Sequence, residues 1–167
     1  MKGQNTISNP FVILLTLLLG LIFFASACQQ ADRETAAAQN EELVNSYIEA
    51  FNAQDRAAME KLLSDPFTYQ EEEMDLETYL ESAEGFWKAF PDMKFDPTHL
   101  LSTEGYVTVR GVLTGTGEGV YRGHALNGQE FEITEIILFH VQEDKIAEAY
   151  AEWDDLDLWE QLGVVEL

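Results

Sequence analysis

The 167-residue sequence has few cysteines and few basic residues, and both shortages narrow its possible functions. Cys28 is the single cysteine, so no disulfide can form within the chain. Nine lysine and arginine residues stand against 31 aspartate and glutamate residues, which gives a formal net charge of −22. A chain this acidic is repelled by nucleic acids and by anionic membrane surfaces. We therefore expect no nucleic-acid partner.

Sequence motifs of several common catalytic classes are also missing. The chain has no GxSxG nucleophile motif, no glycine-rich phosphate loop that opens a helix, and no HExxH pair. His99, His124 and His140 lie far apart in sequence, so we expect no metal site and no cofactor. What remains is acid/base chemistry by a carboxylate, because burial in an apolar pocket raises the pKa of a carboxyl group toward neutrality.

The first 28 residues have the order of an export signal. A short polar start with Lys2 precedes the apolar residues 11–24, and the small residues 25–27 then lead to Cys28. The apolar run is short for a membrane-spanning helix, which needs about 20 residues. A cysteine after small residues resembles the lipobox of bacterial lipoproteins, in which the cysteine is lipidated and becomes the mature N-terminus. The alternative is an uncleaved anchor helix with an incidental cysteine.

This resemblance divides the chain into three parts. We expect a signal peptide at 1–27, a small and polar tether at 28–40, and one folded domain at 41–167. Lipidated Cys28 would then bind the protein to a membrane, with the domain in the periplasm or outside the cell. Glutamine rather than aspartate follows Cys28, which by the same resemblance favours the outer membrane.

The spacing of apolar residues predicts three helices followed by long strands. Residues 41–53 carry an apolar stripe, Asp55 can cap a second helix at 56–63, and a third helix spans 76–90 with Gly85 as a weak point in its interior. A short strand is expected at 67–70, and the acidic run 71–73 that follows it as a solvated loop. Four long strands are expected at 94–103, 106–117, 130–141 and 145–153, before a short helix that Gly163 ends.

Helices followed by a meander of strands predict an α+β fold, with a curved antiparallel sheet around the helices. Such a sheet encloses an apolar hollow, which is the usual kind of small-ligand site. Residues 144–163, DKIAEAYAEWDDLDLWEQLG, resemble the C-terminal signature of SnoaL-like polyketide (ester) cyclases in the NTF2-like superfamily. Phe90-Pro91-Asp92 is similar to the motif that follows the third helix of that family.

The resemblance covers residues 41–165 and implies a cone-shaped cavity and an ester cyclase-like activity. It also implies a possible homodimer through the convex sheet face, where the apolar run 136–139 offers surface. One departure is clear, since the family usually has histidine and aspartate where this chain has Ala149 and Ala151.

Two carboxylates are the main candidates for chemistry. Asp154 matches the last aspartate of the family signature, and by that resemblance it is the catalytic acid/base; the alternative is that it only caps the final helix. Glu135 lies in an apolar strand, and alternation places it on the face of Ile133 and Ile137. It is therefore either an acid in the pocket or an outward-facing residue.

The remaining candidates are expected to bind substrate. His124 lies in a loop that resembles the cavity rim of the family, and Trp153 precedes Asp154. Arg110 could bind an anionic group or form a surface salt bridge. Tyr69 and Trp87 could form pocket wall with a polar tip, or simply pack in the core.

Two functions stay open at this point. The first is an enzyme that acts on a hydrophobic small molecule without a cofactor, as a cyclase, isomerase or hydrolase. The second is a lipid-anchored module that binds a small ligand or a protein without catalysis. Export argues against polyketide cyclisation as such, since that reaction takes place beside a cytoplasmic synthase, and a fold does not by itself determine a function.

Overall fold

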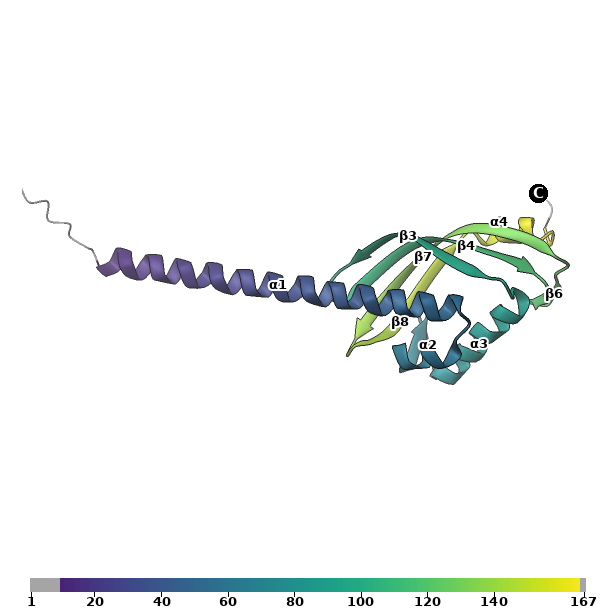
Figure 1. The fold of residues 1–167 in the computed structure, drawn as a ribbon, viewed down its shortest axis with the longest axis horizontal. Coiled ribbons are helices and arrows are strands. Elements are labelled where there is room, and N and C mark those ends of the chain that lie inside the picture. The colour runs from purple at the N-terminus through teal and green to yellow at the C-terminus, as the bar shows by residue number, and fades with distance from the viewer. Residues whose placement is uncertain (1–9, 166–167) are drawn as a thin grey trace, which may run out of the picture.

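The computed structural model describes residues 10–165 of the chain, with side chains described from Gln30 onward. Four helices and a strongly curved sheet make up the described part, and α1 extends far beyond the sheet (Figure 1). The helices are α1 (Pro10–Asn52), α2 (Arg56–Leu62), α3 (Leu76–Ala89) and α4 (Asp155–Gln161). The strands are β1 (Leu63–Tyr69), β2 (Glu72–Met74), β3 (Lys94–Ser102), β4 (Tyr106–Gly117), β5 (Val120–Tyr121), β6 (His124–Ala125), β7 (Gln129–Gln142) and β8 (Lys145–Trp153).

Three of the helices start at an aspartate whose side chain caps them. Asp55 accepts a hydrogen bond from the backbone N–H of Ala58 at 3.0 Å, and Asp75 accepts one from that of Thr78 at 2.9 Å. Each bond satisfies a backbone donor that has no partner inside its helix. The prediction that Asp55 caps the second helix is confirmed, and α2 and α3 each end one residue before the expected position.

The segment expected to be a tether is helical in the structure. Residues 28–40 belong to α1, and the second half of this segment is fastened to the turn between β3 and β4. Asn40 donates hydrogen bonds to the backbone oxygens of Thr103 and Glu104, both at 3.2 Å, and Arg33 forms an ion pair with Glu104 at 2.9 Å. These contacts hold the end of the expected tether, which is part of α1, against the sheet.

The N-terminal predictions lie mostly outside this description. Residues 1–9 and the side chain of Cys28 are not among the described parts, so cleavage and lipidation stay predictions. Across residues 10–165, none of the helices combines the length and the apolar character needed to cross a membrane.

The main sheet is mixed, with the order β2-β1-β8-β7-β4-β3. The expectation of a wholly antiparallel sheet is wrong at one pair, because β1 runs parallel to β8. These strands are distant in sequence, so no hairpin turn determines their direction. The acidic run is also not simply a loop: Glu72 and Glu73 belong to the exposed edge strand β2, which follows a tight turn at Gln70 and Glu71, where φ is 52° and 66°.

The long hairpin of β7 and β8 forms as predicted. Its turn residues Glu143 and Asp144 have φ of 50° and 59°, the left-handed conformation that a two-residue hairpin turn requires and that aspartate tolerates better than most residues. Along β7, alternate side chains point to the concave face of the sheet, and α1 and α3 cover this face (Figure 1). The core lies between the helices and the sheet.

Gly111 and Gly85 differ in whether the surrounding structure leaves room for a side chain. At Gly111 on β4, an added Cβ would lie 2.3 Å from Cζ of Phe95, so the missing side chain admits the Phe95 ring onto the sheet. At Gly85 in the middle of α3, an added Cβ would meet nothing within 4 Å, so no packing contact requires a glycine there.

We predict that Gly85→Ala stabilises the protein by about 0.5–1 kcal/mol, because glycine in a helix interior costs backbone entropy. Thermal unfolding should show a Tm that is higher by a few degrees. The control is Gly111→Ala, which must displace the Phe95 ring and should lower stability by about 1–3 kcal/mol. A Gly85→Ala variant that unfolds at a lower temperature than the wild type would contradict this interpretation.

Candidate functional site

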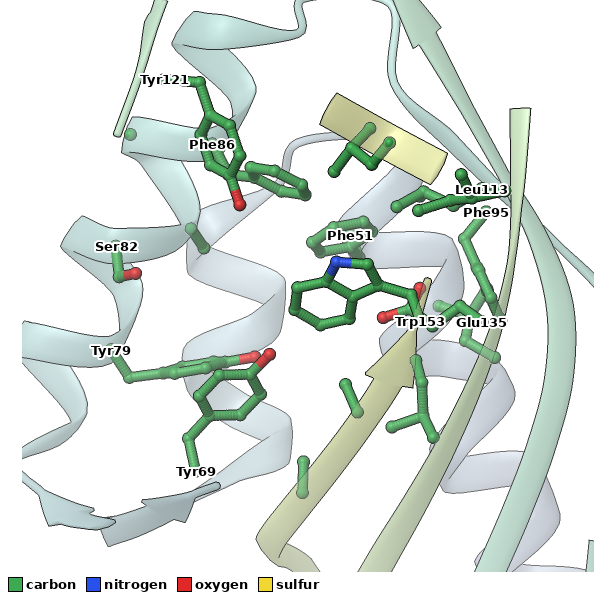
Figure 2. Close-up of a pocket in the computed structure, with 18 of the residues that line it drawn as sticks. Phe51, Tyr69, Tyr79, Ser82, Phe86, Phe95, Leu113, Tyr121, Glu135 and Trp153 are labelled. Atoms are coloured by element: carbon green, nitrogen blue, oxygen red, sulfur yellow. The ribbon is translucent and has the colours of Figure 1, made fainter. Parts of the chain in front are cut away.

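A cavity of about 440 Å³ lies between the concave face of the sheet and helices α1 and α3 (Figure 2). Most of its wall is aromatic or aliphatic. Phe51 comes from α1 and Phe86 from α3, Leu113 and Phe95 come from the sheet, and Leu158 of α4 also contributes. The hollow predicted from the curved sheet is therefore present, and its apolar wall is typical of sites for small hydrophobic ligands.

The carboxyl group of Glu135 is the acidic group in this wall. Glu135 lies on β7 between Ile133 and Ile137, all three line the cavity, and only 8% of its surface is exposed. Among the described residues its carboxyl has neither a hydrogen bond nor an ion pair, and burial is the sole influence that shifts its pKa, so its charge is not compensated. Burial alone raises the pKa of Glu135 from 4.5 to about 7. Near neutral pH this group can therefore both accept and release a proton.

Tyrosine hydroxyl groups are gathered in the same cavity. The hydroxyls of Tyr47 on α1 and Tyr79 on α3 form a hydrogen bond of 2.7 Å, and the ring of Tyr69 on β1 lies 5.6 Å from that of Tyr79. Figure 2 shows the hydroxyl ends of Tyr69 and Tyr79 pointing into the cavity, toward the wall that carries Glu135 and Trp153. Burial, and to a smaller extent the nearby Glu135 carboxylate, raises the pKa of all three tyrosines.

These hydroxyls thus stay protonated and can act as hydrogen-bond donors. In the Tyr47–Tyr79 pair, one hydroxyl donates to the other, which leaves a single O–H free for another acceptor. A ligand oxygen in the cavity would be such an acceptor.

Strand β8 contributes small side chains and one indole to the cavity. Ala149, Ala151 and Trp153 all line it, and Trp153 lies opposite Glu135 in the β7–β8 register. The indole N–H of Trp153 donates to Asp155 at 3.1 Å, which fixes the ring in the wall. Trp153 and Tyr69, both expected to bind substrate, line the cavity, and their binding of a substrate stays a prediction.

Asp154 lies outside the cavity, contrary to the expectation of a carboxylate inside the pocket. Its side chain is exposed and accepts a hydrogen bond from the N–H of Asp157 at 3.0 Å, which makes it the N-cap of α4. The helix-capping alternative therefore describes its position. The strand ends at Trp153, and the chain turns outward before Asp154, so the pocket carboxylate is Glu135 on the neighbouring strand.

The other predicted binding residues are dispersed. His124 is exposed on β6, with its ring 5.3 Å from that of Trp159 and not in the cavity wall. Arg110 is exposed on β4, alternates with the buried Val109, and donates to Thr98 and Thr134. Trp87 is buried against Phe51, so core packing accounts for its position. None of these three residues lines the cavity.

Sequence reasoning missed Tyr47, Tyr79 and Arg122. Tyr47 and Tyr79 lie within the helices expected at 41–53 and 76–90, and no periodic pattern distinguishes a hydroxyl that faces a cavity from one that faces solvent. Arg122 lies at the cavity, 5.2 Å above the ring of Tyr121 and 3.3 Å from Asp155. Within the described residues, no three acidic, histidine or cysteine side chains are close enough together to hold a metal ion.

Comparison with known proteins gives a consistent result. The model of the SnoaL-like polyketide cyclase family matches residues 41–162. No curated protein sequence matches the chain. Solved structures do match, at sequence identities that are informative about the fold alone.

Three of these structures illustrate the similarity. AclR from Streptomyces galilaeus, a candidate hydroxylase, is 22% identical with a TM-score of 0.70, over 78% of this chain and 99% of its own. IdmH from Streptomyces antibioticus, a candidate polyketide cyclase, is 24% identical with a TM-score of 0.66, over 74% of this chain and 98% of its own. TsrD from Streptomyces laurentii is 20% identical with a TM-score of 0.71, over 77% of this chain and 97% of its own.

We predict that Asp154→Ala lowers the free energy of unfolding by about 0.5–2 kcal/mol, because the N-terminus of α4 loses its cap. Chemical denaturation of the wild type and the variant measures this loss. Asp154→Ser is the matched control, since serine also caps helices and should restore most of the stability. Unchanged or increased stability of Asp154→Ala would show that the side chain is not a cap.

A second prediction concerns Glu135 and pH. The pKa of this carboxyl is higher in the folded protein than in the unfolded chain, so the folded state holds the proton more tightly. The stability contributed by protonated Glu135 is complete below about pH 4.5 and is lost as the pH rises through about 7. The difference corresponds to about 3 kcal/mol.

Glu135→Gln removes this titration and keeps the shape of the side chain. Its Tm should equal that of the wild type near pH 4 and exceed it by several degrees at pH 8. Glu132→Gln, an exposed position on the same strand, should not show this dependence. If Glu135→Gln and the wild type differ equally at both pH values, Glu135 is not the buried group described above.

Proposed function

Because the chain belongs to the SnoaL-like polyketide cyclase family, we propose that it is an enzyme that transfers a proton on a hydrophobic small molecule, with Glu135 as acid/base. The observation that carries this proposal is the position of Glu135, a buried carboxyl without a partner in an apolar cavity. A protein does not retain such a group for stability, because an unpaired charge in an apolar site is destabilising. Groups of this kind occur at sites where proton transfer is needed.

The tyrosine hydroxyls can stabilise the substrate oxygen on which negative charge develops. A substrate with a carbonyl group can place the C–H beside that carbonyl against Glu135 and its oxygen against the hydroxyls of Tyr69, Tyr79 and Tyr47. The Glu135 carboxylate removes the proton from carbon, and the electron pair of the C–H bond moves to the carbonyl oxygen as an enolate. A tyrosine O–H stabilises that oxygen by a hydrogen bond, in a site from which apolar walls exclude water.

The enolate then has two possible fates. Its carbon can take the proton back from Glu135, which gives an isomerised or exchanged product. It can also attack a second carbonyl of the same molecule, in which case a C–C bond closes a ring and the new alkoxide receives a proton. Both outcomes conserve the oxidation state of the substrate and return Glu135 to its carboxylate form once the proton leaves.

The family resemblance places a histidine and an aspartate where this chain has Ala149 and Ala151, and both alanines line the cavity. In the β7–β8 pairing, Ala151 of β8 lies opposite Ile137 of β7. Glu135 precedes Ile137 by two residues on β7. In this chain the carboxylate of the cavity is therefore carried by β7, and the alanines of β8 add space beside it.

The alternative function is a non-catalytic module that binds a hydrophobic ligand in the same cavity. The loss of polar side chains at Ala149 and Ala151 favours it. We also propose that the protein is exported and held at a membrane, with the outer membrane favoured, by lipid on Cys28. The contacts of Arg33 and Asn40 would then fix the domain relative to its anchor. A homodimer through the convex face of the sheet stays a prediction.

The proposal predicts proton exchange that depends on Glu135. A panel of hydrophobic ketones and esters is incubated with the protein in D₂O, and NMR measures deuterium incorporation beside the carbonyl. Glu135→Gln should lower the rate at least about a hundredfold, and the wild-type rate should rise with pH and be half-maximal near pH 7, because the carboxylate form is the base. Tyr79→Phe should cause a smaller loss.

Glu132→Gln serves as the control for this experiment and should keep the wild-type rate, since its carboxyl is exposed outside the cavity. If compounds bind with equal affinity to the wild type and to Glu135→Gln and no exchange occurs, the binding module is the correct function.

A further inference from the structure

The wall of the cavity is open at one place. Of the residues that line it, Ser82, Gly85, Val120 and Arg122 are exposed, and all the others are buried or half-buried. Ser82 and Gly85 lie three residues apart on α3, and Val120 and Arg122 lie at either side of Tyr121 at β5. The mouth of the cavity is therefore the gap between the middle of α3 and β5.

Both sides of this gap are held in place. The backbone N–H of Glu118 donates to the oxygen of Ala89 at 2.9 Å, which attaches the start of the β5 segment to the end of α3. On the far side, Arg122 is paired with Asp155 on α4 at 3.3 Å. The rings of Phe86 and Tyr121 lie 5.3 Å apart between these two attachments. The mouth is thus bounded by fixed elements, and the side chains along it determine its width.

We propose that Gly85 keeps this mouth open and sets how fast molecules reach Glu135; this inference rests on the proposed function of the cavity. Gly85 weakens α3, because a glycine in a helix interior is unfavourable. No packing contact compensates for this weakness, since an added Cβ would meet nothing within 4 Å. The open space that a side chain would occupy is the space through which a substrate passes.

The position of the mouth fits this role. The β5–β6 hairpin lies beside the C-terminal half of α3, at the end of the molecule away from the N-terminal part of α1 (Figure 1). Inside the mouth the carboxyl of Glu135 is unpaired and 8% exposed, which is a second and independent sign that the cavity receives a ligand. Because Gly85 lines the cavity and is exposed, a bulky residue at this position would occupy open space at the rim of the cavity.

The test uses N-phenyl-1-naphthylamine, a neutral fluorophore that brightens in apolar sites, and stopped-flow measurement of its association and dissociation with the full chain. Gly85→Phe should slow both rates at least about tenfold and leave Kd within about threefold of the wild type, because a narrowed mouth raises the barrier and leaves the cavity unchanged. Gly85→Ala should slow both rates by a smaller factor of about two, since a methyl group narrows the gap without closing it.

The matched control is Glu81→Phe, which places the same side chain on an exposed position of α3 that does not line the cavity. It should keep the wild-type rates. Equal rates in Gly85→Phe and Glu81→Phe would overturn the role of Gly85 while leaving the proposed function intact. A wild-type protein that does not bind the fluorophore at all, or binds it with equal affinity after Leu113→Glu, would overturn both, because the cavity would then not receive hydrophobic molecules.

Discussion

The burial of one unpaired carboxyl group, that of Glu135, is the constraint on which the account of this protein depends. The side chain is 8% exposed and has no charge or hydrogen-bond partner among the described residues. Ionising it in this place is costly, and the cost appears as a pKa of about 7. Such a group is a liability for folding and an advantage for proton transfer near neutral pH.

The surrounding structure brings this carboxyl to a usable position. The alternation of β7 points it to the concave face, and the missing side chain at Gly111 lets the Phe95 ring cover the sheet next to it. Helices α1 and α3 then bring the hydroxyls of Tyr47 and Tyr79 within 2.7 Å of each other in the same cavity. An acid and a set of neutral hydrogen-bond donors therefore line one enclosed space.

Much of the fold follows from local sequence patterns. The capping aspartates mark where α2, α3 and α4 begin, and the alternation in β7 places Glu135 on the same face as Ile133 and Ile137, although the sequence left open whether that face is the inner one. The parallel pairing of β1 with β8 could not be predicted, because it joins segments about eighty residues apart and no turn fixes their direction. Residues 28–40 are rich in alanine, glutamine and other good helix formers and continue α1, whereas the contacts of Arg33 and Asn40 with the turn between β3 and β4 are tertiary and are not encoded locally.

The site was predicted less well than the fold, and the reason is geometric. Asp154 was chosen by its place in a motif, yet the chain leaves the sheet at Trp153 and turns the aspartate outward as a helix cap. Tyr47 and Tyr79 were recognised only as apolar-stripe residues, since helical spacing says which face is buried but not where a cavity interrupts the packing. Their meeting depends on the relative placement of α1 and α3, which is a tertiary property.

The most direct measurement of the central claim is a pH titration of the Glu135 carboxyl itself. With glutamate labelled by ¹³C at its side-chain carboxyl carbon, NMR follows each carboxyl resonance through pH, and Glu135→Gln identifies the resonance that belongs to Glu135. We expect the Glu135 resonance to titrate near pH 7. A Glu135 resonance that titrates near the ordinary glutamate value of about 4.3 would contradict it, because the carboxyl would then be solvated or paired and no longer suited to proton transfer at neutral pH.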